Sequence, residues 1–136
     1  MPSTPISKCT PVLVVERIEP ALDFWAKLAV EKVTSVPEGD HLGFVILAGP
    51  GIELMYQTAT SVAGDLLAAA SDKGAFRSGP QQTTLFVEVP ELARVERCLA
   101  GERQIMPFRT TFYGAKELGY LDGAGNVVVF AEMAAH

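Results

Sequence analysis

The sequence predicts an α+β fold made of two tandem β-α-β-β-β modules. Each half opens on a strand-like run that a proline and a helical pattern follow, VLVVE at 12–16 and TLFVE at 84–88. Each half closes on an apolar strand led in by glycine, GIELMYQT at 51–58 and GNVVVFAEM at 125–133. Two copies of one long pattern indicate a pseudo-symmetric protein, with any function lying between the halves.

Length and composition bound the class of protein. A chain of 136 residues fits a single domain, 1–136, with module one at about 9–57, a linker helix and loop at about 58–81 and module two at about 82–133. The net charge is 11 − 16 = −5 and the basic residues are scattered, which argues against a nucleic-acid partner. No apolar run reaches the ~20 residues of a membrane span. Two cysteines and no signal-peptide pattern predict a cytoplasmic protein.

The elements follow from periodicity and turn residues. Pro20 and Pro90 each suit the first turn of a helix, and the Ala- and Leu-rich stretch 62–70 predicts one short helix. Gly49-Pro50-Gly51 and the turn at 122–126 join strands as hairpins. Strands are expected at 9–16, 33–36, 41–48, 52–57, 83–89, 104–108, 116–121 and 127–132.

In this order the segments resemble the vicinal oxygen chelate superfamily, which includes glyoxalase I, bleomycin-resistance proteins and extradiol dioxygenases. TPVLVVERIEPALDFW at 10–25 resembles the family's first strand and helix, and GIELMYQT its fourth strand. YGAKELGYLDGAGNVVVFAE at 113–132 resembles its closing hairpin, here without the usual proline in the turn. The resemblance implies curved sheets that form a cleft, and a homodimer that completes the cleft in many members.

The resemblance also implies four cleft positions that hold a divalent metal in metal-using members. They fall here on Thr10, Glu53, Gln82 (or Gln81 beside it) and Val129. Glutamate is a good ligand and glutamine a tolerable neutral one, whereas threonine is poor and valine cannot coordinate. We therefore expect no cofactor, and keep a weakly held metal on Glu53 and Gln82 as the alternative.

Strand alternation adds further side chains to the face that carries these positions. They are Val12, Val14, Met55, Gln57, Thr84, Phe86, Val127 and Ala131. The opposite face is uniformly apolar and should pack under the helices, through Leu13, Val15, Ile52, Leu54, Leu85, Val87, Val128 and Phe130. Apolar walls with a few polar groups are typical of a small-molecule pocket.

Glu53 is the residue expected to carry chemistry. If it is unpaired in an apolar cleft its pKa should rise, and it could bind a cationic group or act as a general base. The other interpretation is that Glu53 pairs with a nearby Arg or Lys, or reaches solvent.

Three aromatic residues, Phe108, Phe112 and Tyr113, lie in and around the loop before the seventh strand. Members of the family use this region to cover the cleft and stack on ligands; ordinary packing at a sheet end is the other interpretation. Arg109 and Glu117 are expected at the surface, where Arg109 could meet an anionic ligand.

The resemblance and the strand pattern together predict a protein that binds a small amphipathic or aromatic molecule in an apolar cleft, without a catalytic metal. The residues expected to line it are Thr10, Val12, Glu53, Met55, Gln82, Phe86, Phe108, Phe112, Tyr113 and Val129. The acidic net charge favours cationic ligands. The alternatives are a lyase, isomerase or dioxygenase that uses Glu53, and a dimeric interaction module with a vestigial cleft.

Overall fold

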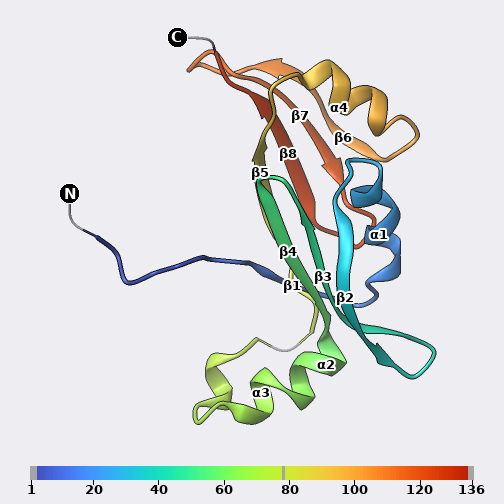
Figure 1. The fold of residues 1–136 in the computed structure, drawn as a ribbon, viewed down its shortest axis with the longest axis vertical. Helices are drawn as coiled ribbons and strands as arrows, with labels where there is room; N and C mark the ends of the chain where they lie inside the picture. The colour runs from blue at the N-terminus through green and yellow to red at the C-terminus, as the bar shows by residue number, and fades with distance from the viewer. Residues whose placement is uncertain (1–2, 78, 135–136) are drawn as a thin grey trace.

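The computed structural model describes residues 3–77 and 79–134, in which eight strands form two four-stranded sheets (Figure 1). The first sheet has the order β1-β4-β3-β2 and the second β5-β8-β7-β6. Their bounds are β1 Val12–Val15, β2 Glu31–Glu38, β3 His41–Gly49, β4 Ile52–Thr58, β5 Thr84–Glu88, β6 Gln104–Thr110, β7 Lys116–Leu121 and β8 Val127–Glu132. Helix α1 (Glu19–Ala26) follows β1, and α4 (Leu92–Cys98) follows β5. The predicted α+β fold of two tandem modules is confirmed.

The two modules pair their strands in the same way. β1 runs parallel to β4, with Val12 opposite Met55, and β5 runs parallel to β8, with Phe86 opposite Val129. In each module the closing strand is antiparallel to the strand before it. Paired residues lie on the same face of a sheet, so the faces predicted from alternation agree with the observed register.

One hydrophobic core lies under the helix-facing sides of both sheets. Phe24 of α1 stacks on Phe130, with ring centroids 6.4 Å apart, and meets Tyr120 edge-on at 6.5 Å, although both partners belong to the second sheet. Figure 1 shows α1 and α4 on the same side of the molecule. We call the side of each sheet that faces away from this core its open face. It carries Val12, Val14, Glu53, Met55 and Gln57 in sheet one, and Thr84, Phe86, Val127, Val129 and Ala131 in sheet two.

A buried chain of hydrogen bonds joins the modules at the β7–β8 turn. Nε1 of Trp25 donates to the Tyr56 hydroxyl at 2.8 Å, and this hydroxyl donates to Oδ2 of Asp122 at 2.5 Å. Oδ1 of Asp122 accepts from the backbone N–H groups of Ala124 at 2.8 Å and Asn126 at 3.0 Å. Burial raises the pKa of Tyr56 well above its usual value, and the negative charge of Asp122 adds to this effect. The hydroxyl therefore keeps the proton that it donates.

The segment between the modules does not form the single helix that the sequence predicts. α2 (Ala59–Gly64) and α3 (Leu66–Ala69) are separate because Asp65 between them leaves the helical region, at φ −121° and ψ −91°. Gln57 on the open face of sheet one is buried, and its Nε2 donates to Oγ of Ser61 in α2 at 2.9 Å. α2 thus covers one end of that face. Among the described residues, every helix falls short of the length and apolarity needed to cross a bilayer.

Candidate functional site

The open faces present apolar side chains that the single chain leaves partly uncovered. Phe86 is 53% exposed and Val12 is 37% exposed. Their neighbours in register, Val129 and Met55, are half-buried. Contiguous apolar area on a protein surface marks an interaction or ligand site more often than a scattered exposed residue does. The open faces are therefore the candidate binding surface.

Glu53 is paired on the open face of sheet one. Its Oε1 accepts from the Thr10 hydroxyl at 2.8 Å, and its Oε2 lies 2.9 Å from Nζ of Lys8. The hydrogen bond from the Lys8 ammonium lowers the pKa of Glu53 below its usual value, and the hydrogen bond from the Thr10 hydroxyl adds a smaller effect in the same direction. The structure thus brings Thr10 and Glu53 together and shows the paired carboxylate of the second interpretation. A lowered pKa makes a carboxylate a weaker base.

The equivalent positions of module two have different partners. Nε2 of Gln82 donates to the carbonyl oxygen of Gly125 at 3.1 Å, and Val129 lies beside Phe86. Within residues 3–77 and 79–134, no three His, Cys, Asp or Glu side chains gather as a ligand set. The positive charge of the Lys8 ammonium already neutralises the negative charge of Glu53. These donors do not fit a divalent metal shared by Glu53 and Gln82, since such a site needs about three protein ligands.

The sequence predicts Glu117 at the surface, and this prediction is wrong, because its side chain is only 2% exposed. Glu117 lies in register with Ala131 of β8 and Arg109 of β6, so it occupies the open face of sheet two. Nε and Nη2 of Arg109 contact its Oε1 at 2.9 and 2.8 Å. The Tyr113 hydroxyl donates to its Oε2 at 2.8 Å. Extending the alternation across the β7–β8 hairpin would have placed Glu117 on this face.

The pKa of Glu117 leads to a testable pH dependence. The hydrogen bond from the Tyr113 hydroxyl lowers this pKa below its usual value of 4.5, and the Arg109 guanidinium lowers it further. Burial acts in the opposite direction but does not outweigh them. A carboxyl whose pKa is lower in the folded chain stabilises the fold above the unfolded pKa, and this stabilisation is lost as the pH falls. We expect Glu117→Gln to make the free energy of unfolding depend less on pH between about 5 and 3.

Urea unfolding at stepped pH values measures this slope. Glu88→Gln is the matched control, because it removes an exposed carboxylate from the same face. A slope in Glu117→Gln as steep as that of the wild type would contradict the assignment.

Two aromatic rings adjoin the buried carboxylate. Phe112 is fully exposed and Tyr113 is 46% exposed, and their rings meet edge-on with centroids 5.0 Å apart. The loop that carries them is held by Thr111, whose carbonyl oxygen and Oγ1 accept from the backbone N–H groups of Gly114 and Ala115, both at 3.0 Å. Phe112 and Tyr113 therefore lie together at the border of the open face of sheet two.

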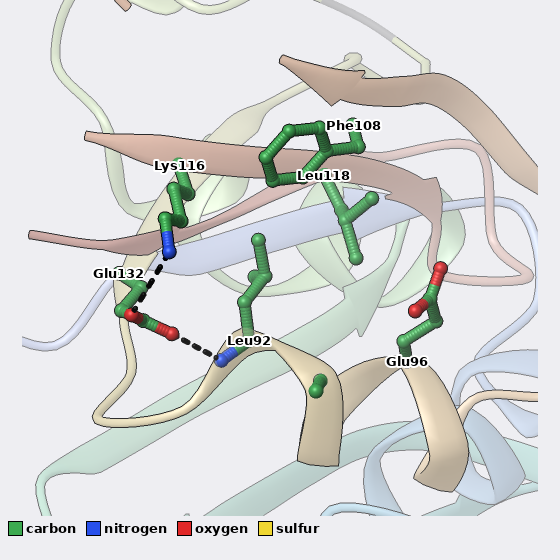
Figure 2. Close-up of a pocket in the computed structure, with 7 residues that line it drawn as sticks. Leu92, Glu96, Phe108, Lys116, Leu118 and Glu132 are labelled. Atoms are coloured by element: carbon green, nitrogen blue, oxygen red, sulfur yellow. Dashed lines mark hydrogen bonds and ion pairs between the residues drawn. The ribbon is translucent and has the colours of Figure 1, made fainter. Parts of the chain in front are cut away.

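Phe108 does not lie on the open face with them. Met106 pairs with Gly119 and Arg109 pairs with Glu117, so three steps along β6 span two along β7. The extra residue is a bulge, which turns Phe108 toward the helix side. There it borders a hollow of about 270 Å³ between α4 and sheet two (Figure 2). The other lining residues are Leu92, Ala93, Glu96, Lys116, Leu118 and Glu132.

A second hollow, of about 370 Å³, lies where the two sheets meet. Ile52 and Leu54 at the start of β4 line one side, and Leu85, Phe86 and Val87 of β5 line the other. Phe86 thus belongs both to the open face and to a hollow between the modules. This is where the internal repeat predicts the function to lie.

Solved structures share this fold, although no family profile and no curated protein matches the sequence. TioX from Micromonospora sp. ML1 has a TM-score of 0.71 at 14% identity, covering 94% of this chain and 99% of TioX. A lactoylglutathione lyase from Agrobacterium tumefaciens has a TM-score of 0.67 at 18% identity, covering 94% and 95%. A bleomycin-binding protein complexed with bleomycin has a TM-score of 0.60 at 14% identity, covering 95% and 100%.

The protein therefore has the fold of the glyoxalase, bleomycin-resistance and dioxygenase proteins. The resemblance to the vicinal oxygen chelate superfamily is confirmed at the level of the fold. Identities of 14% and 18% leave the function to be argued from the residues of this chain.

Proposed function

We propose that the protein binds a small amphipathic or aromatic molecule in an apolar cleft, without a catalytic metal. The observation that supports this most is Phe86, which is 53% exposed on the open face and borders the hollow of about 370 Å³ between the sheets. Val12 and Val129 add apolar wall, and the pairs at Glu53 and Glu117 add polar groups, the usual composition of a ligand pocket. A bleomycin-binding protein has the same fold, which supports the proposal by analogy only.

The proposed cleft is closed by a second copy of the chain. Both sheets turn their other sides toward one shared core, and in residues 3–77 and 79–134 of the single chain Phe86 and Val12 on the open faces stay exposed. A homodimer that brings open faces together would cover Phe86, Val12 and the exposed ring of Phe112. A stable interface of this kind buries on the order of 1,600 Å². The proposed binding unit is therefore a homodimer.

A thermal-shift screen of aromatic, amphipathic and cationic metabolites and antibiotics tests the proposal. A ligand that binds only the folded state raises Tm, and we expect such a rise in the wild type but not in Phe86→Ala. Phe76→Ala is the matched control, because Phe76 is 41% exposed but lies in the linker between the modules. Light scattering after size-exclusion chromatography should give twice the chain mass of 14.6 kDa.

Other outcomes would contradict the proposal in distinct ways. A monomer would overturn the homodimer, and a dimer that no compound stabilises would favour the interaction module. The same assay with Ni²⁺, Zn²⁺ or Mn²⁺ addresses the lyase, isomerase or dioxygenase alternative. A rise in Tm with metal that Glu53→Gln abolishes would overturn binding without a metal.

A further inference from the structure

A contribution to the stability of the fold does not by itself explain why Arg109 and Glu117 form an ion pair on the open face of sheet two. Glu117 is 2% exposed and its partner Arg109 is 60% exposed. Taking a carboxylate out of water costs free energy, and an ion pair with a solvent-exposed partner typically contributes little stability in return. Val129 and Ala131 on the neighbouring strand show that apolar residues fill this face. The pair therefore needs an explanation other than packing.

The pair holds the guanidinium of Arg109 in one orientation. A guanidinium has five N–H donors, and Nε and Nη2 of Arg109 both contact Oε1 of Glu117. Oε2 of Glu117 is held by the Tyr113 hydroxyl at 2.8 Å, so the carboxylate cannot turn away. Among the described residues, Nη1 of Arg109 makes no hydrogen bond. A fixed planar guanidinium with donors left over suits the oxygens of a carboxylate, sulfonate or phosphate.

An aromatic surface adjoins this donor. Tyr113, which contacts Glu117, also meets the fully exposed ring of Phe112 with centroids 5.0 Å apart. Phe86 and Val129 continue the apolar surface across the same sheet. One ligand that carries both a ring and an oxyanion would cover the exposed rings and engage the remaining donors of Arg109.

We propose that the ligand is an aromatic or amphipathic molecule that carries one oxyanion group, and that Arg109 selects for this group. The guanidinium binds the oxyanion, and Phe112 with the apolar open face holds the ring. Glu117 and Tyr113 are positioning residues that fix Arg109. The inference rests on the proposed function, since it concerns the same cleft.

The net charge of −5 favours cations at long range, but contact distances decide recognition. Glu88, an acidic residue on the same face, is two strands from Glu117, with Ala131 between them. Two strand spacings are about 10 Å, which exceeds the Debye length of ~8 Å at physiological salt. An oxyanion in contact with Arg109 therefore interacts with the guanidinium far more strongly than with Glu88, while Glu117, whose Oε1 lies 2.8 Å from Nη2, offsets part of this attraction.

Two fluorescent probes with one aromatic body test this assignment. 8-Anilinonaphthalene-1-sulfonate carries a sulfonate, and N-phenyl-1-naphthylamine lacks it. Titrated against the full chain, Arg109→Gln should raise the Kd of the sulfonate at least about tenfold, because charge-assisted hydrogen bonds are lost. The Kd of the neutral probe should change less than about twofold. Arg97→Gln is the matched control, because it removes one positive charge from the exposed side of α4.

A second variant guards against misfolding. Arg109→Gln alone leaves Glu117 buried without its cation, so Arg109→Gln combined with Glu117→Gln removes both charges, and it should show the same selective loss. Equal losses for both probes, or no loss for the sulfonate, would overturn the role of Arg109 while the proposed cleft stands. A wild-type protein that binds neither probe would overturn the proposed function and this inference with it.

Discussion

The Asp122→Ala substitution is expected to lower the free energy of unfolding by about 4 kcal/mol, out of the roughly 5–15 kcal/mol of a typical domain. The carboxylate is fully buried and accepts from the Tyr56 hydroxyl and from the backbone N–H groups of Ala124 and Asn126. Alanine leaves these donors without an acceptor, and each such buried group costs roughly 1–3 kcal/mol. Urea unfolding followed by the fluorescence of Trp25, the single tryptophan, measures the change.

Asp122→Asn is the matched control. It keeps one oxygen for the two backbone N–H groups but places an NH₂ group against the Tyr56 hydroxyl and the Nδ2 group of Asn126. We expect it to cost about 2 kcal/mol, half the effect of alanine. A loss below about 1 kcal/mol for Asp122→Ala would contradict the conclusion that this carboxylate joins the modules.

The Gly123→Ala substitution is expected to cost about 3–4 kcal/mol. Gly123 has φ +91°, where an L-residue is strained by about 1–2 kcal/mol. An added Cβ would also lie 2.9 Å from the carbonyl carbon of Pro20 and closer to its oxygen. Because the contact is with backbone, the β7–β8 turn or the start of α1 must move, at a further cost of about 1–3 kcal/mol.

Gly125→Ala separates the two causes. Gly125 has φ +94°, but a Cβ there would meet no atom within 4 Å. It should therefore cost only the backbone strain of about 1–2 kcal/mol. Equal losses for the two variants in urea unfolding would show that the turn does not press on α1.

Most strands are predictable because their signals are local. The expected strands at 52–57 and 127–132 agree closely with the observed Ile52–Thr58 and Val127–Glu132. In strands without a bulge the face of each residue also follows, because side chains alternate along a strand. The linker between the modules is less predictable. Helix propensity is a weak prior, and the break at Asp65 divides the expected helix in two.

The candidate site is less predictable, because its contacts join residues that strand patterns do not connect. Glu53 takes Lys8 from 45 positions away as its partner. Glu117 is buried because Arg109 lies opposite it across β6 and β7, and because the loop returns Tyr113 to it. β6 shifts register against β7 twice, between Gln104 and Met106 and between Met106 and Arg109, and these shifts decide which side Phe108 faces. Such bulges and loop returns depend on tertiary packing more than on local sequence.

The sequence by itself determined the order of the elements along the chain, their two-module repeat and the faces of the residues in β1, β4, β5 and β8, because hydrophobic period and turn chemistry act over a few residues. Only the tertiary structure decided what those side chains meet. Joining the modules through one core turns both open faces outward, and folding the Tyr113 loop onto β7 places a buried carboxylate behind Arg109. Burial then raises the pKa of Tyr56, and hydrogen bonds lower the pKa values of Glu53 and Glu117, because these contacts form only once strands and loops have packed together.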